Sequence, residues 1–118
     1  MAILSSHLLN SLTGEHAANV KVIIFKFDKS NQAKKVKETH TDVGGRMLEE
    51  FQINEKDKLC EFEMVIKTEN YFKNKNHKDW ANRIISDVVI RFKMEADNKK
   101  YHIPIIISPN GYSVWWSE

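Results

Sequence analysis

The sequence predicts an all-β protein, an antiparallel β-sandwich. Two segments, residues 60–67 and residues 87–94, alternate apolar and polar side chains with a period of two. This period is typical of strands that bury one face. Turn residues such as Gly44-Gly45 and Pro109-Asn110-Gly111 separate these runs, and short strands at this spacing favour a sandwich. At 118 residues, the chain is expected to form a single domain over residues 1–118.

Two further segments are predicted as strands. Residues 20–28 are apolar on both faces for part of their length, which indicates a strand covered on two sides. In residues 101–108, three isoleucines alternate with His102 and should fill the core. His102 should therefore point outward. Pro104 has no backbone N–H to donate, so this strand is expected at a sheet edge or irregular at that point.

The remaining segments complete the predicted fold. Residues 3–9 alternate, with Ser5 and His7 on one face and Ser6 on the other. Residues 68–81 break the strand pattern, because they are polar with isolated aromatic residues. Thr68 is expected to cap one short helix there, anchored by Tyr71-Phe72.

Composition excludes several classes of protein. The net charge of +2 comes from 18 basic and 16 acidic residues, so no nucleic-acid partner is expected. No apolar run is long enough for a transmembrane helix, so no membrane partner is expected either. The start of the chain lacks a basic segment followed by an apolar one, which predicts the cytoplasm, or the periplasm if a leader was removed. Cys60, the single cysteine, is expected to pack in the middle of its strand.

Motifs for phosphate, zinc and serine chemistry are missing from the sequence. His7, His40 and His102 could be combined into a metal site on paper, but their spacing is not that of metal ligands. No metal and no cofactor are therefore expected.

Two histidines and one arginine are the candidate chemical groups. An outward His102 beside apolar Ile106 indicates a face covered by another subunit. The alternative is that His7 and His102 are ordinary surface histidines. Arg46 follows the Gly44-Gly45 turn and offers a planar fork for a carboxylate or a urea-like carbonyl, or is simply a solvated charge.

The C-terminal tail, residues 112–118, holds two of the three tryptophans. It is either a terminal strand packed on its own sheet or an aromatic wall of a pocket or subunit interface.

Several motifs resemble the transthyretin-like family over essentially the whole chain. Residues 4–10 (Leu-Ser-Ser-His-Leu-Leu-Asn), with Thr13-Gly14 and Ala17 after them, resemble its opening motif. Residues 101–113 resemble its closing motif. The turn over residues 41–46 (Thr-Asp-Val-Gly-Gly-Arg) is similar to the family's middle turn, and Tyr71-Phe72 stands where the family has the same pair.

The resemblance implies a transthyretin-like sandwich of about eight strands with one short helix, assembled as a homotetramer, a dimer of dimers. It also implies the 5-hydroxyisourate hydrolase branch, which is marked by His7, Arg46 and His102. Water would attack a cyclic amide carbonyl of this purine-derived heterocycle, a step of urate breakdown that needs no metal or cofactor. Arg46 would bind carbonyls or stabilise charge, and the two histidines would transfer protons.

The family's substrate-binding tail falls here on four residues: Trp115, Trp116, Ser117 and Glu118. Trp116 replaces an arginine, Glu118 adds a carboxylate, and His16 stands where the family usually has proline. These departures favour an alternative function, a non-catalytic carrier that binds an aromatic ligand in the channel between dimers. A third hypothesis is a sandwich module that binds only protein partners.

Overall fold

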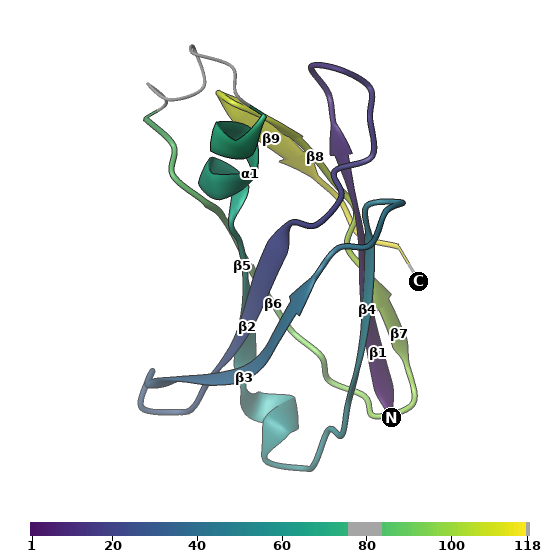
Figure 1. Ribbon diagram of the computed structural model, residues 1–118. Helices are drawn as coiled ribbons and strands as arrows, with labels where there is room; N and C mark the ends of the chain where they lie inside the picture. The colour runs from purple at the N-terminus through teal and green to yellow at the C-terminus, as the bar shows by residue number, and fades with distance from the viewer. Residues whose placement is uncertain (76–83, 118) are drawn as a thin grey trace.

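A computed structural model describes residues 1–75 and 84–117. Its strands and helices follow one another along the chain (Figure 1): β1 Ala2–Asn10, β2 Lys21–Phe27, β3 Ala33–His40, β4 Arg46–Phe51, a short 3₁₀ helix Asp57–Leu59, β5 Glu61–Ile66, α1 Thr68–Asn74, β6 Val88–Phe92, β7 Lys100–His102, β8 Ile105–Ser108 and β9 Gly111–Val114. The described residues thus form the mostly antiparallel β-structure with one short α-helix that the sequence predicts.

The strands form two sheets that pack as a sandwich. One sheet has the order β4-β1-β8-β9, with β7 also paired to β1, and the other has the order β3-β2-β5-β6. The first strand lies in the middle of its sheet because β4 pairs with it antiparallel on one side while β7 and β8 pair with it parallel on the other. Strands from opposite ends of the chain are therefore neighbours.

The strand predicted over residues 101–108 is divided at Ile103-Pro104. β7 ends before this pair and β8 begins after it, as expected where proline interrupts a ladder. This division gives nine strands in the described residues where about eight were expected. Ile105 and Ile107 are fully buried, which confirms that the isoleucine face points into the core.

The core lies between the two sheets. Both sheets, α1 and the residues flanking β2 and β6 contribute large side chains that are fully buried: Leu4, Leu8, Val20, Val22, Ile24, Phe62, Met64, Ile66, Phe72, Met94, Ile105 and Ile107. On β2, the predicted cover on both sides is only partial, since Val22 is buried but Ile23 and Phe25 on the other side are half-buried.

The expectation that Thr68 caps the helix is wrong. Lys67 is the N-cap, and Thr68 is the first helical residue. Its side chain is buried, and its hydroxyl donates to the Ser86 carbonyl at 3.3 Å. Tyr71 and Phe72 are buried, as predicted, and anchor α1 on the core. Residues 76–81 of the predicted segment lie outside the described residues.

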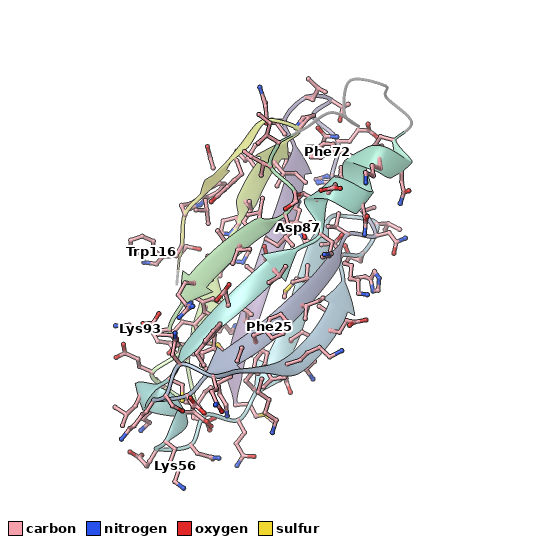
Figure 2. The ribbon with its side chains drawn as sticks, turned by 90° about the vertical axis from the view of Figure 1, so that its left-hand side faces the viewer. Phe25, Lys56, Phe72, Asp87, Lys93 and Trp116 are labelled. Carbon is pink, nitrogen blue, oxygen red and sulfur yellow. The ribbon has the colours of Figure 1, made fainter. Side chains whose placement is uncertain are left out.

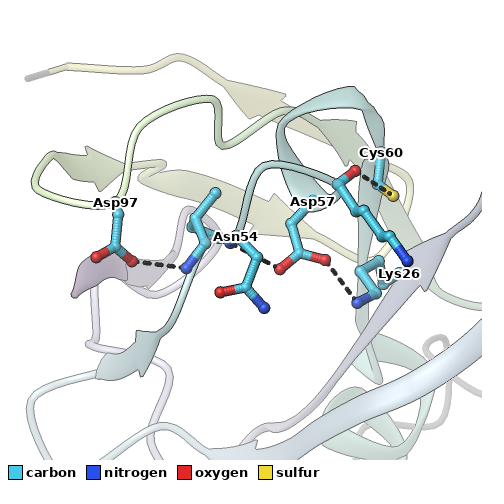
Figure 3. A network of polar contacts seen from close by, with 7 residues as sticks. Lys26, Asn54, Asp57, Cys60 and Asp97 are labelled. Carbon is cyan, nitrogen blue, oxygen red and sulfur yellow. Dashed lines mark hydrogen bonds and ion pairs between the residues drawn. The ribbon is translucent and has the colours of Figure 1, made fainter.

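A polar network closes the end of the sandwich near the 3₁₀ helix (Figure 3). The Lys26 ammonium lies 2.8 Å from the Asp57 carboxylate, which also accepts the Asn54 N–H. Burial alone would raise the pKa of Asp57, but these two contacts outweigh burial and lower it. Cys60 precedes β5 and contacts the Lys56 carbonyl, so its placement in the middle of a strand is wrong. This network has a structural role.

None of the helices in residues 1–75 and 84–117 has the length and apolar character needed to cross a membrane.

Candidate active site

Alternation along β1 separates two adjacent serines with different partners. Ser6 points inward, and its hydroxyl donates to the Ile103 carbonyl at 2.6 Å. This bond satisfies a carbonyl at the point where Pro104 interrupts the ladder. Ser5 points outward, and its Oγ lies 2.8 Å from Nδ1 of His102 on the paired strand β7. The outer serine therefore orients the His102 ring.

His7 is two residues further along β1, on the same outer face as Ser5. It pairs with Arg46, the first residue of β4. In an antiparallel ladder, directly opposed residues project from the same face of the sheet. The fold therefore brings His7, Arg46 and His102 to one outer face.

The turn before β4 holds Arg46 in this position. One carboxylate oxygen of Asp42 accepts the backbone N–H groups of Gly44 and Arg46, both at 2.9 Å. The bond from the Arg46 N–H is the main reason why the pKa of Asp42 lies below its ordinary value of 3.8. Gly45 has φ +73°, and a Cβ there would collide with the Leu8 carbonyl. Only glycine allows the turn to pack this close to β1.

A third segment joins this arrangement through the backbone of Leu8. The Leu8 N–H donates to the Gly45 carbonyl at 2.7 Å, and the Leu8 carbonyl accepts the Ala17 N–H at 2.9 Å. Residue 16 is thereby placed beside His7. Nδ1 of His16 lies 2.9 Å from Nε2 of His7, with the ring centroids 5.0 Å apart.

The surroundings of His7 favour its neutral form. Its pKa lies below the ordinary value of 6.5, mainly because of burial and then because of the positive charge of Arg46. His16 and His102 lower the pKa further, while a hydrogen bond to the Gly44 backbone acts in the opposite direction. A neutral imidazole near pH 7 can accept a proton, and its conjugate acid can readily donate one.

The tail folds back along the segment that carries His102. After β9, the Trp115 N–H points to the Pro104 carbonyl at 3.4 Å. Ser117 and His102 then exchange two backbone hydrogen bonds, of 2.9 and 3.2 Å. The tail is thus paired with its own sheet, yet its tryptophan side chains are exposed. Trp116 is 81% exposed and projects away from the ribbon in Figure 2.

A hollow of about 530 Å³ opens beside the tail, between β6 and the C-terminal segments. Its exposed lining is mostly apolar and includes Trp115 and Trp116 from the tail and Ile90 and Phe92 from β6. His102, Ser117 and four basic residues also border it. His7 and Arg46 do not line it. Both predictions for the tail therefore hold in part. Its backbone pairs with its own sheet, as in a terminal strand, and its two tryptophans line the hollow.

The predicted site residues are therefore found together, with some exceptions. His7, Arg46 and His102 share one face, and Ser117 reaches His102. Glu118 lies outside the described residues. His40 ends β3 in the opposite sheet, and no metal-binding group of three His, Cys, Asp or Glu exists within residues 1–75 and 84–117.

Three residues with roles at this face were not predicted as site residues. Ser5 had a usable signal, because it shares the predicted outer face with His7. Asp42 is the second residue of the 41–46 turn and its only carboxylate, at a common position for a residue that caps a turn. The contact of His16 with His7 had no local signal, since it depends on how the chain folds back after β1.

These features define a class of protein: a two-sheet β-sandwich with two imidazoles and a guanidinium on the outer face of one sheet. The sequence matches the HIUase/Transthyretin family over residues 4–116, and the chain belongs to this family. It is 30% identical over 112 residues to the 5-hydroxyisourate hydrolase of Mesorhizobium japonicum. That alignment covers 95% of this chain and 89% of the relative.

Solved structures show the same fold. The 5-hydroxyisourate hydrolase of Klebsiella pneumoniae superimposes with a TM-score of 0.78 at 20% identity, with 100% of both chains covered. Sea bream transthyretin in complex with thyroxine gives 0.78 at 14% identity, covering 97% of this chain and 93% of that chain. An (S)-allantoin synthase gives 0.82 at 21% identity and covers 99% of this chain, which spans only 44% of the synthase.

Proposed function

We propose that this protein is a hydrolase that opens the ring of 5-hydroxyisourate. The observation that carries the proposal is the convergence of His7, Arg46 and His102 on one outer face, through the β1–β4 and β1–β7 pairings. Membership of the family and the similarity to named 5-hydroxyisourate hydrolases support it.

The reaction assigns a task to each group. Water attacks a ring amide carbonyl, one imidazole accepts the water proton, and the carbon–nitrogen bond breaks as the other imidazole protonates the leaving nitrogen. The two rings, His7 and His102, divide these proton transfers. The Arg46 guanidinium donates to the carbonyl oxygen as negative charge develops on it. The tail residues beside His102, from Trp115 to Glu118, would contact the substrate.

A second copy of the chain completes this site in the proposal. His7 and Arg46 line no hollow described for the single chain, and the same outer face exposes apolar Leu48, which is 60% accessible. Water would reach an uncovered site and weaken every electrostatic interaction in it. We therefore propose that the active form is the homotetramer that the family resemblance implies.

The test is the decay of freshly prepared 5-hydroxyisourate, followed by its ultraviolet absorbance. Wild-type protein should accelerate the decay, and His102→Ala or His7→Ala should each lower kcat by about 100-fold or more. Arg46→Lys keeps the charge but loses the planar fork, so it should lose activity too. His40→Ala, an exposed histidine on the other sheet, is the matched control and should retain full activity.

The carrier function has one observation in its favour, the exposed tryptophans beside the apolar hollow. It predicts no acceleration by the wild type, together with quenching of tryptophan fluorescence by flat aromatic ligands. Trp116→Arg then distinguishes a carrier from a disabled hydrolase. Hydrolysis by this variant, in the absence of hydrolysis by the wild type, would show that the tail disables a competent site. Light scattering on the same samples reports assembly, and a monomer that accelerates the decay would remove the tetramer from the proposal.

A further inference from the structure

His16 is fixed against His7 by the backbone of three segments. The Ala17 N–H donates to the Leu8 carbonyl, and the Asn10 N–H donates to the Glu15 carbonyl at 2.8 Å. Residue 16 lies between these two bonds and opposite Leu9. On its other side, Gly45 is so close that an added Cβ would lie 3.3 Å from the His16 Cβ. The approach of the two rings is therefore a consequence of backbone pairing.

The distance between the two rings makes them share one hydrogen. Nitrogens 2.9 Å apart form a hydrogen bond in which one donates and the other accepts, so two imidazolium rings cannot keep this contact. The Gly44 backbone bond raises the pKa of His7, as expected when a ring N–H donates to a carbonyl. With Nε2 facing His16, the nitrogen left for Gly44 is Nδ1.

This arrangement orders both rings. Neutral His7 keeps its hydrogen on Nδ1, toward Gly44, and Nε2 accepts the Nδ1–H of His16. The exposed Nε2 of His16 is then the end of a hydrogen-bonded chain of two imidazoles. A proton taken up at that end can be passed inward to Nε2 of His7, because each ring can exchange the nitrogen that carries its hydrogen.

We propose that His16 is a positioning residue that fixes the tautomer and the ring orientation of His7 and relays protons between His7 and solvent. The relay has meaning for catalysis only if the proposed hydrolase function is correct. The tautomer and the pairing of the two rings do not depend on that function.

The charged groups that surround the pair come from each neighbouring element. Arg46 on β4 and His102 on β7 act on His7. Asp42, in the turn before β4, interacts electrostatically with His7. Beside His16, Glu15 forms a long ion pair with Lys75 after α1, at 3.9 Å. Any change in the titration of His7 must be read against these groups, which the variants below leave in place.

Two variants separate positioning from a structural role. His16→Ala removes the shared hydrogen, part of the cover over His7 and a neighbouring charge. Weaker burial of His7 and the loss of repulsion from His16 should both raise the pKa of His7. Nε2 of His7 also becomes open to water. His16→Asn keeps an amide close to the position of the lost Nδ1 and should preserve the His7 tautomer. Because the His16 side chain is exposed, both variants should fold.

The measurement is a two-bond ¹H–¹⁵N correlation spectrum of the histidine rings over a pH titration. In the wild type, His7 should be a single Nδ1–H tautomer over the pH range in which it is neutral. In His16→Ala, the tautomers should mix and the pKa of His7 should rise, while His16→Asn should retain the wild-type tautomer. An unchanged His7 spectrum in His16→Ala, or a wild-type His7 already in mixed tautomers, would overturn the proposal. His40→Ala is the control and should leave the His7 signals in place.

Kinetics then test the relay separately. If the wild type hydrolyses 5-hydroxyisourate, His16→Ala should lower kcat more than it changes KM and should shift the His7 limb of the pH profile upward, while His16→Asn should restore the kcat only in part. If the pH profile of His16→Ala were the same as that of the wild type, the proposed relay would be contradicted. If the wild type shows no turnover but the spectra agree with the prediction, the hydrolase proposal fails and the positioning role stands.

Discussion

The two histidines of the candidate site are held in different ways. His7 lies on the β4 side of this outer face, where a turn, a neighbouring segment and a second imidazole surround it. His102 lies on the β7 side, opposite Ser5, and is held by one serine hydroxyl and by backbone bonds from the tail. The His7 side depends on particular side chains and on one glycine. The His102 side depends mostly on backbone pairing, which is independent of side-chain identity.

This difference explains how the side chains of the tail can vary while His102 keeps its place. The bonds between Ser117 and His102 are formed by backbone atoms, so they are compatible with tryptophan at positions 115 and 116. Changes in the tail alter what lines the hollow beside His102. Changes at residues 42–46 alter where His7 and Arg46 lie relative to each other.

The largest effect is expected on the His7 side, from Gly45→Ala. The substitution combines a strained φ of +73° with a collision against the Leu8 carbonyl, so the free energy of unfolding should fall by about 3 kcal/mol or more. Chemical denaturation measures it. Gly14→Ala, with φ +80° and open space around its Cβ, should cost only about 1–2 kcal/mol. Gly44→Ala lacks both penalties, and a loss as large as that of Gly45→Ala would contradict the packing described.

A smaller effect is expected near His102, where two adjacent serines should affect different properties. Ser6 should matter mainly for stability, and Ser5 mainly for activity. Ser6→Ala leaves the buried Ile103 carbonyl without its hydroxyl partner and should destabilise the fold by about 2 kcal/mol. Ser5→Ala should cost about 0.5 kcal/mol, since the site is half-buried, but should lower kcat about fivefold by releasing the His102 ring. Denaturation and the absorbance assay on both variants check this. If Ser6→Ala and Ser5→Ala lost the same amount of stability and the same amount of activity, this division of roles would be contradicted.

The smallest effect concerns the charge of Asp42. Its folded pKa is lowered, so the unfolded chain binds more protons between the folded value and 3.8. Its stabilisation is therefore complete above the unfolded value and is lost as the pH falls through the folded value. Asp42→Asn keeps the oxygen acceptor and removes the charge, so it should lose less stability than the wild type from about pH 7 to about pH 3.

Hydrogen exchange of the Arg46 amide sharpens this comparison. Asp28 also accepts backbone N–H groups in an exposed loop and has a lowered pKa, so Asp28→Asn should reduce the acid sensitivity in the same direction. Asp42→Ala removes the acceptor and should speed exchange at Arg46, whereas Asp28→Ala should not. Faster exchange in both variants, or in neither, would show that the carboxylate does not hold the turn.

The sequence predicted the fold where a local pattern and the final structure agree. Alternation identified the buried face of β8 and the outward direction of His102, since a strand must turn one side to the core. Pro104 predicted the interruption between β7 and β8. The helix cap was wrong because Thr68 finds its partner in Ser86, eighteen residues away, a contact that no local rule contains.

The grouping of the candidate residues was predictable only in part. His7, Arg46 and His102 were named as candidates because they sit in recognisable motifs, and the β1 pairings bring them to one face. Ser5 was within reach of the same alternation. His16 was not, because its contact with His7 arises from three backbone segments that converge on Leu8. Cys60 was misplaced because the 3₁₀ helix before β5 delays the start of the strand by one residue.

The parallel pairing of β1 with β7 and β8 has a consequence for synthesis of the chain. The contact between Ser5 and His102 joins residues 97 positions apart, and long-range pairings of this kind form late and slowly. On the ribosome, the central strand must wait with an unpaired edge until almost the whole polypeptide has emerged. The interval between translation of the first strand and of the seventh is therefore the period in which a newly made chain is most exposed to aggregation.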